Sequence, residues 1–92
     1  MSGMIAEFIV VEGSVQGVGF RAFSASLARK LGVTGMVRNC PDYSVELVAE
    51  GTAQELDNFV EGLKKGNGWS RVDRISVTET RPRGFATFDI VD

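Results

Sequence analysis

Histidine is absent from the 92-residue chain, and cysteine occurs once, as Cys40. Without imidazole the chain lacks the commonest general base and the commonest metal ligand, and every Ser–His or Cys–His nucleophile is excluded. A lone cysteine cannot form an internal disulfide, so we expect a reducing, cytoplasmic environment. No apolar run approaches the roughly 20 residues of a membrane span, and the start MSGMIAEFIV lacks the basic segment and cleavage site of a signal peptide. We therefore predict a protein that works away from membranes and without histidine chemistry.

An excess of positive charge is also missing, because 10 lysines and arginines face 12 aspartates and glutamates. A nucleic-acid binder with a broad basic face is therefore not expected, and the lack of a C-x-x-C pair argues against a metal chaperone. The length suits one domain with a single modest core. We assign this domain to residues 5–92 and expect residues 1–4 to be a disordered start. Because no apolar stripe is left over to demand a dimer, we expect a monomer.

Hydrophobic periodicity predicts two helices and five strands. Apolar residues at helical spacing begin at Phe20 and end before Gly32, and a capping box at Thr52–Glu55 opens a second helix that ends before Gly66. β-branched and alternating segments predict the strands Ile5–Val11, Val33–Asn39, Val45–Glu50, Arg74–Thr80 and Phe85–Val91. Two helices separated by a hairpin favour an α+β ferredoxin-like βαββαβ sandwich, with both helices on one face of an antiparallel sheet of four or five strands.

The segment GSVQGVGFRAF at residues 13–23 places three glycines directly before an arginine at a helix start. A plain glycine-rich connection is the simplest interpretation and stays open. The stretch also matches the dinucleotide pattern G-x-G-x-x-G/A, but a hairpin follows instead of a second βαβ unit, and the acidic residue about 20 positions on is missing. A Walker phosphate loop is excluded because the sequence Gly-Lys-Ser/Thr is missing.

A metal-free oxyanion cradle explains both the glycines and the arginine. Successive amides of a glycine loop that leads into a helix point at one spot, where the helix dipole also favours an anion. Gly17 and Gly19 let the main chain come close to a ligand, and Arg21 in the first turn can add a bidentate contact to a phosphate. The alternative for Arg21 is a surface ion pair, which the helix dipole opposes at this end.

The string Gly13-Ser-Val-Gln-Gly-Val-Gly-Phe-Arg21 resembles the phosphate-binding signature of the acylphosphatase family almost letter for letter. A second element, Gly35-Met-Val-Arg-Asn39-Cys-Pro-Asp42, is similar to the strand that carries the family's other catalytic residue. Weaker likeness continues to the terminal pattern at Phe88 and Ile90, so the resemblance spans residues 5–91.

This resemblance implies hydrolysis of the carboxyl–phosphate bond of small acyl phosphates, without cofactor, metal or phosphoenzyme. By the same resemblance Arg21 and Asn39 are catalytic: Arg21 grips the phosphoryl group, and Asn39 positions the attacking water. The main-chain amides implied to bind the phosphoryl group are those of Ser14, Val15, Gln16, Gly17, Val18, Gly19 and Phe20. By itself, Asn39 is more typical of a turn residue at a strand end, and its combination with the loop is what favours catalysis.

The hairpin after Asn39 departs from the family, which usually has Asp-Gly where this chain has Asp42 and Tyr43. Because tyrosine resists a positive φ, the turn type and the placement of Asn39 are open. Arg38 should face the opposite side of its strand and is left out of the site. We interpret Cys40 as incidental, and Trp69 as an anchor of its loop rather than a binding aromatic.

Two rival functions stay open. One is a non-enzymatic module that senses an anion or small metabolite on the same fold, and the other is a domain of a larger carbamoyl-phosphate-handling protein, in which this motif also occurs by resemblance. The end of the chain just after its last strand favours a free-standing enzyme. An RNA-recognition module shares the fold class, but the acidic balance and the missing aromatic pair on the central strands count against it.

Overall fold

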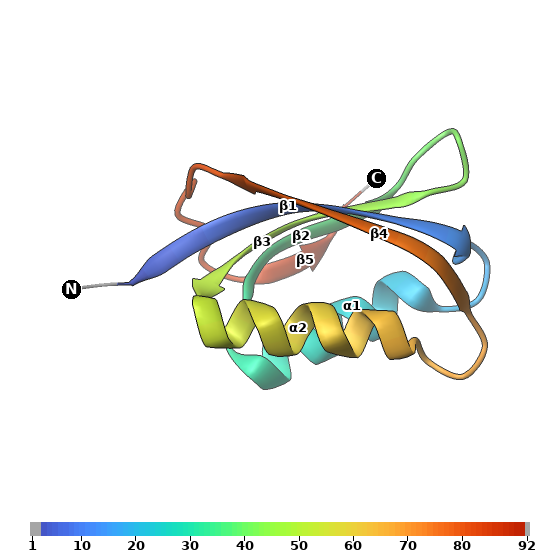
Figure 1. The fold of residues 1–92 in the computed structure, drawn as a ribbon, viewed down its shortest axis with the longest axis horizontal. Helices are drawn as coiled ribbons and strands as arrows, with labels where there is room; N and C mark the ends of the chain where they lie inside the picture. The colour runs from blue at the N-terminus through green and yellow to red at the C-terminus, as the bar shows by residue number, and fades with distance from the viewer. Residues whose placement is uncertain (1–2, 92) are drawn as a thin grey trace.

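The computed structural model describes residues 3–91, and Figure 1 shows them as one curved sheet with both helices beneath the same face. Along the chain the elements are β1 (Met4–Ser14), α1 (Phe20–Leu31), β2 (Thr34–Asn39), β3 (Val45–Thr52), α2 (Ala53–Lys65), β4 (Arg71–Thr80) and β5 (Phe88–Ile90). The predicted α+β sandwich is confirmed, with its βαββαβ order and a fifth strand. Of the expected disordered start, Met1 and Ser2 lie outside the described residues, and Met4 is the first residue of β1.

The sheet has the order β4-β1-β3-β2-β5 and is mixed rather than wholly antiparallel. The pairs β1–β3, β1–β4 and β2–β3 are antiparallel, whereas β5 lies parallel to β2, with Gly35 opposite Phe88 and Val37 opposite Ile90. β4 and β5 therefore occupy opposite edges. The connection at residues 81–87 runs from one edge of the sheet to the other and reverses the direction of the chain. As a result β5 runs in the same direction as β2. This corrects the expected antiparallel sheet, because a parallel partner at this edge depends on a long-range crossing.

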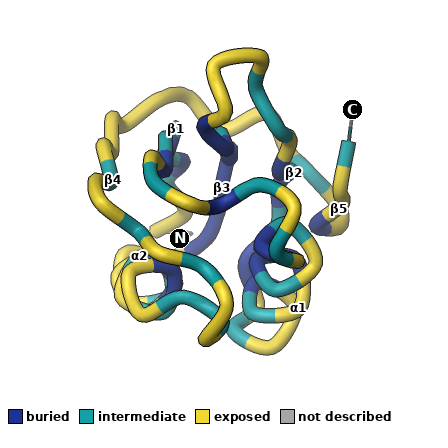
Figure 2. The backbone as a smooth tube through the Cα atoms, turned by 90° about the vertical axis from the view of Figure 1, so that its right-hand side faces the viewer, coloured by how far each residue is buried: buried dark blue, intermediate teal, exposed yellow. Residues whose placement is uncertain are grey.

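The core lies between the helices and the sheet, where Figure 2 shows the buried backbone concentrated in β3, β2 and the inner sides of the helices. Alternation along β1 turns Ile9 and Val11 toward the helices, and both are fully buried. At about 25 cal/mol per Å² of apolar surface removed from water, this cluster is the main source of stability. Its members are Ile9, Val11, Val15, Phe20, Ala25, Ala28, Val33, Val37, Val45, Leu47, Ala49, Leu56, Phe59, Leu63 and Phe88.

Both helices end as predicted, but their first turns differ in capping. Gly32 closes α1 with φ 81°, and its N–H donates to carbonyls of the last turn. α2 begins with the predicted capping box, in which the Thr52 hydroxyl accepts from the Glu55 N–H and the Glu55 carboxylate accepts from the Thr52 N–H. α1 has no side chain in this role, a difference that matters at the site below.

The strand ends differ from the prediction where the signal is not local. β1 and β4 extend together, past a bulge between Glu12 and Gly13, until Ser14 pairs with Arg71. β5 is limited to Phe88–Ile90, the three residues that pair with β2. Within residues 3–91, no helix is both long and apolar enough to cross a membrane.

Candidate functional site

The loop that joins β1 to α1 is held at both ends by burial. Val15 and Phe20 are 2% and 1% exposed, and both belong to the core cluster. Between them φ is positive at Gly17 (76°) and Gly19 (78°) and at no other loop residue, so its sign alternates along the loop. A side chain at either glycine would cost about 1–2 kcal/mol in this left-handed region. Alternation of this kind curves the main chain into a concavity lined by N–H groups, which is suited to an anion.

The first turn of α1 carries no capping group. Gly19 is its N-cap, no side chain accepts from the first-turn N–H groups, and the turn contains no acidic residue. Since four N–H groups at every helix start lack intrahelical partners, α1 presents donors that α2 satisfies with its capping box. The positive end of the α1 dipole lies at the same place. An anion would supply both missing interactions.

Arg21 stands in this first turn with its side chain half-buried. Among residues 3–91, no carboxylate forms an ion pair with its guanidinium and no acceptor forms a hydrogen bond with it. A cation at a helix N-terminus is unfavourable unless an anion offsets it. The surface ion pair considered as the alternative for Arg21 is therefore not formed within the described chain.

A cavity of about 170 Å³ lies at this end of α1. Four predicted site residues line it, together with two that were not predicted: Val15, Gly19, Phe20, Arg21, Ala22 and Ile90. Ile90 comes from β5, and its position beside α1 follows from the parallel pairing with β2. The Phe88-x-Ile90 pattern marked a last strand but contained no signal for this neighbourhood. Gln16, Gly17, Val18 and Asn39 do not line the cavity, and Ser14 belongs to the sheet, paired with Arg71.

Asn39 ends β2 on the face of the sheet that carries the helices. Val37, two residues earlier, is fully buried in the core, and a two-residue period places Asn39 on the same side. The Oδ1 atom of Asn39 is buried, and within the described residues it accepts no hydrogen bond. A buried acceptor without a partner is costly, so a water or ligand donor at this position would be stabilising.

The neighbours of Asn39 fit the interpretation that excluded them from the site. Arg38 is exposed and forms an ion pair with Glu46 on the adjacent strand, away from the helices. Burial, the largest cause, raises the pKa of the Cys40 thiol above its ordinary value. A raised pKa reduces the thiolate fraction and with it the reactivity of the sulfur.

The β2–β3 hairpin keeps a turn that requires positive φ although the residue there is tyrosine. Tyr43 has φ 72°, and every other residue with a positive φ within residues 3–91 is a glycine. The turn is closed by Tyr43 N–H donating to Cys40 O at 3.1 Å and Cys40 N–H donating to Ser44 O at 2.8 Å. The Asp42 carboxylate accepts from the Ser44 hydroxyl and N–H, and these bonds lower its pKa. The turn thus has a positive φ at Tyr43, and the tyrosine is strained there.

Two carboxamides that hold the glycine loop went unrecognised in the sequence. Gln16 Nε2 donates to Cys40 O at 2.9 Å and to Ser44 O at 2.8 Å, which joins the loop to the hairpin. Asn67 Nδ2 donates to Val18 O at 2.8 Å, which joins the loop to the connection between α2 and β4. Sequence separations of 24 to 49 residues leave no local signal for such bonds.

The expectation that Trp69 anchors its loop is wrong. Its side chain is 81% exposed, and the loop is instead held by Asn67. The Oδ1 atom of Asn67 accepts from the N–H groups of Trp69 and Ser70, at 3.0 and 2.9 Å. A side chain with both donor and acceptor can turn a loop and fasten it elsewhere, as asparagine commonly does.

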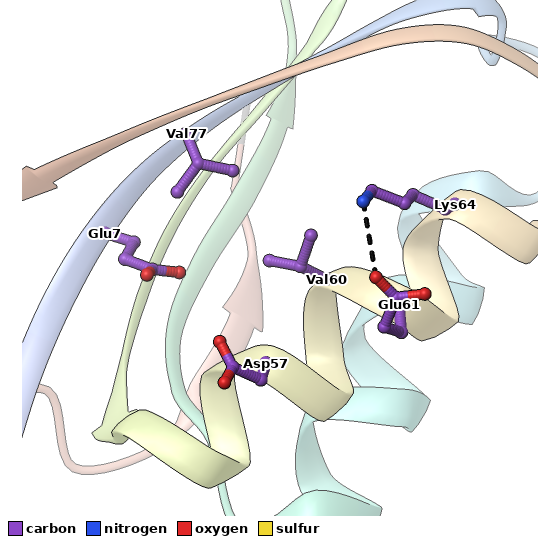
Figure 3. A pocket seen from close by; sticks show the side chains of 6 residues that line it. All are labelled: Glu7, Asp57, Val60, Glu61, Lys64 and Val77. Atoms are coloured by element: carbon purple, nitrogen blue, oxygen red, sulfur yellow. Dashed lines mark hydrogen bonds and ion pairs between the residues drawn. The ribbon is translucent and has the colours of Figure 1, made fainter.

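A second hollow, between α2 and the β1–β4 side of the sheet, has the wrong charge for a phosphoryl group. Figure 3 shows Glu7 and Val77 facing Asp57, Val60 and Glu61 on α2, while Lys64 is paired with Glu61 at 3.3 Å. Burial first, and then the charges of Asp57 and Glu79, raise the pKa of Glu7. Carboxylates that already repel one another do not favour a further anion. The glycine loop is therefore the better candidate site.

Comparisons with known proteins identify relatives that cover nearly the whole chain. The family model described as Acylphosphatase matches residues 7–90. A Treponema denticola protein named Acylphosphatase is 46% identical over 82 residues, which cover 89% of this chain and 87% of the relative. The crystal structure of acylphosphatase from Bacillus subtilis has a TM-score of 0.92 at 45% identity, over 96% of this chain and 99% of that one. Full-length HypF in its phosphate- and nucleotide-bound form gives a TM-score of 0.88 at 29% identity, over 100% of this chain and 12% of HypF.

Proposed function

The chain belongs to the acylphosphatase family and is an enzyme that hydrolyses acyl phosphates, and we propose that Arg21 and the β1–α1 loop bind the phosphoryl group while Asn39 positions the attacking water. The observation that carries this proposal is the uncapped start of α1, where free N–H donors and Arg21, which has no ion-pair partner among residues 3–91, adjoin one cavity. The main-chain amides are those of the residues from Ser14 to Phe20.

The proposed binding step rests on charge and donor geometry. A phosphoryl group offers three oxygens that carry negative charge, and it would satisfy both the first-turn amides and the Arg21 guanidinium. Each charge-assisted hydrogen bond contributes about 1.5–3 kcal/mol. Because these donors stabilise the charge that a metal ion would otherwise neutralise, we propose that the reaction needs no metal.

The proposed chemical step asks little of an acid or base. The leaving group is a carboxylate, which departs without protonation, so a site without histidine is sufficient. Asn39 can accept a hydrogen bond from the water at its buried, unpartnered Oδ1, but an amide cannot serve as a strong base. Its proposed task is to hold the water in line with the bond that breaks, and the oxygens of the substrate can take the proton.

We also propose a cytoplasmic monomer. The single cysteine supports the location. The large apolar side chains exposed among residues 3–91 are few and lie on five different segments of the chain, which supports the monomer: Met4, Tyr43, Trp69, Val77 and Ile90. Light scattering during size-exclusion chromatography measures the mass and would reveal a dimer.

The mechanism is tested with benzoyl phosphate as substrate in excess chelator. Wild-type protein should release phosphate, and loss of turnover in chelator would contradict metal independence. Arg21→Ala should weaken inhibition by inorganic phosphate at least about tenfold, since about 1.4 kcal/mol corresponds to a factor of ten. Arg74→Ala, which removes an exposed arginine on β4, is the matched control. Asn39→Ala should lower kcat about a hundredfold with little change in phosphate inhibition; unchanged kcat would refute its role.

A further inference from the structure

We propose that the Gln16 side chain is a positioning residue, which holds the phosphate loop and Asn39 in one geometry by bridging two carbonyls of the β2–β3 hairpin. The proposal rests on the proposed function, because it assumes that the loop binds the phosphoryl group and that Asn39 positions the water. Gln16 is the sole loop residue, among those described, whose side chain reaches the hairpin.

The bridge uses both hydrogens of the Gln16 side-chain amide. Its two amide hydrogens go to Cys40 O at 2.9 Å and to Ser44 O at 2.8 Å. These carbonyls are the ones that close the turn, since Cys40 O also accepts from Tyr43 N–H and Ser44 O also accepts from Cys40 N–H. Gln16 therefore grips the hairpin at its closing residues, immediately after Asn39. A movement of the hairpin relative to the loop would break both bonds.

The same bonds argue against a direct contact between the Gln16 side chain and substrate. With both hydrogens committed, the atom left over is Oε1, which is an acceptor. An acceptor repels phosphoryl oxygens, and Gln16 does not line the cavity beside Arg21. The side chain is half-buried and spans to the hairpin instead. Its effect on the reaction must pass through the residues that it positions.

A second side-chain hydrogen bond to the same loop, donated by Asn67, provides a comparison that separates positioning by Gln16 from general support of the loop. Asn67 Nδ2 donates to Val18 O at 2.8 Å and so holds the loop from the side of the α2–β4 connection. Within residues 3–91 no side chain of that connection bonds to the hairpin. Loss of the Asn67 bond should therefore disturb phosphate binding. Loss of the Gln16 bonds should disturb the distance between the bound phosphoryl group and Asn39, and a displacement of about 1 Å can cost a hundredfold in rate.

The experiment compares Gln16→Met, which is neutral and of nearly the same length but has no side-chain hydrogen to donate, with Gln54→Met as control. Gln54 is an exposed glutamine of α2 that donates to Asn58, far from the loop in sequence. With benzoyl phosphate, Gln16→Met should lower kcat about tenfold or more, because both bonds are lost. Inhibition by inorganic phosphate should change by less than about threefold, since Asn67 and the buried ends still hold the loop. Asn67→Ala should show the reverse pattern.

A double mutant shows whether Gln16 acts through Asn39. In the Asn39→Ala background, Gln16→Met should cost little further kcat, because the positioned group is already gone. Equal factors in both backgrounds would overturn the proposal, as would an unchanged kcat in the single variant or a loss of phosphate inhibition as large as the loss of kcat. Circular dichroism checks the fold, and Gln16→Leu is measured in the same way if the methionine variant does not fold. A wild-type protein without turnover would refute the proposed function, whereas wild-type turnover with unchanged kcat in Gln16→Met would refute this inference alone.

Discussion

Replacing Tyr43 by glycine should stabilise the protein. Tyr43 holds φ at 72° in the hairpin, where a Cβ atom crowds the following carbonyl. Its ring gives little in return, because the residue is 76% exposed. The main-chain bonds that close the turn, Tyr43 N–H to Cys40 O and Cys40 N–H to Ser44 O, do not depend on the side chain. Glycine would keep these bonds and remove the strain.

The size of the effect is the difference between two opposing terms. Relief of the left-handed conformation is worth about 1–2 kcal/mol, whereas the greater freedom of glycine in the unfolded chain costs about 0.4–1 kcal/mol. The net gain is about 0.5–1 kcal/mol, which raises the Tm of a domain of this size by roughly 2–8 °C. Since the turn keeps its shape, Asn39 keeps its place, and kcat should not change.

Thermal melts followed by far-UV circular dichroism measure this gain. Trp69 fluorescence is a poor substitute, because that side chain is already 81% exposed in the folded state. Tyr43→Ala is the matched control, since it removes the ring but keeps the Cβ atom and the strain, and its Tm should not rise. Equal Tm values for the glycine and alanine variants would show that the strain at Tyr43 is not stored in φ.

Replacing the carboxylates of Glu7 and Glu50 by amides should have opposite effects on stability. Burial, then Asp57 and Glu79, raise the Glu7 pKa, so the folded state keeps a proton that the unfolded chain releases, and stability falls as pH rises through that range. Glu7→Gln should therefore raise Tm near pH 7, with no difference below about pH 4. Glu50 is 2% exposed and accepts from three N–H groups of the β4–β5 connection. Glu50→Gln should lower the free energy of unfolding by at least about 1.5 kcal/mol, or Tm by roughly 6 °C or more, because an amide hydrogen replaces an acceptor. Denaturant unfolding measures this loss. Equal stability of the variant and the wild type would show that these three hydrogen bonds do not stabilise the fold.

Features set by neighbouring residues could be predicted from the sequence. The helix ends at Gly32 and Gly66 and the start at Thr52 depend on contacts within one turn, so their signals are local. The opposite directions of Arg38 and Asn39 follow from the two-residue period of a strand. The motif around Arg21 was readable because loop, helix start and cation are contiguous in the chain.

Features that depend on distant partners could not be predicted. The parallel edge strand β5 depends on the connection between β4 and β5. The side-chain carboxylate of Glu50, 33 to 35 residues away, holds this connection by accepting from three of its main-chain N–H groups. Ile90 lines the cavity because of that edge strand. Trp69 was misread because a large aromatic usually fills space, while the bonds that fix its loop come from Asn67. For β5 and Ile90 the partner is far away in sequence. Asn67 lies two residues before Trp69, but its bond to Val18 O in the glycine loop spans 49 residues and has no local signal.

The physical logic of the site explains why the absence of histidine is no handicap. The proposed binding groups are main-chain N–H dipoles and an arginine, and neither needs to change protonation for the reaction. Such groups stabilise charge well when they are already oriented, because no reorganisation is then needed during the reaction. Several residues of this chain serve to orient these binding groups. Two left-handed glycines shape the loop, buried Val15 and Phe20 fix its ends, and carboxamides from Gln16 and Asn67 hold its sides. Rate in this enzyme should therefore respond more to loss of these ties than to pH near neutrality.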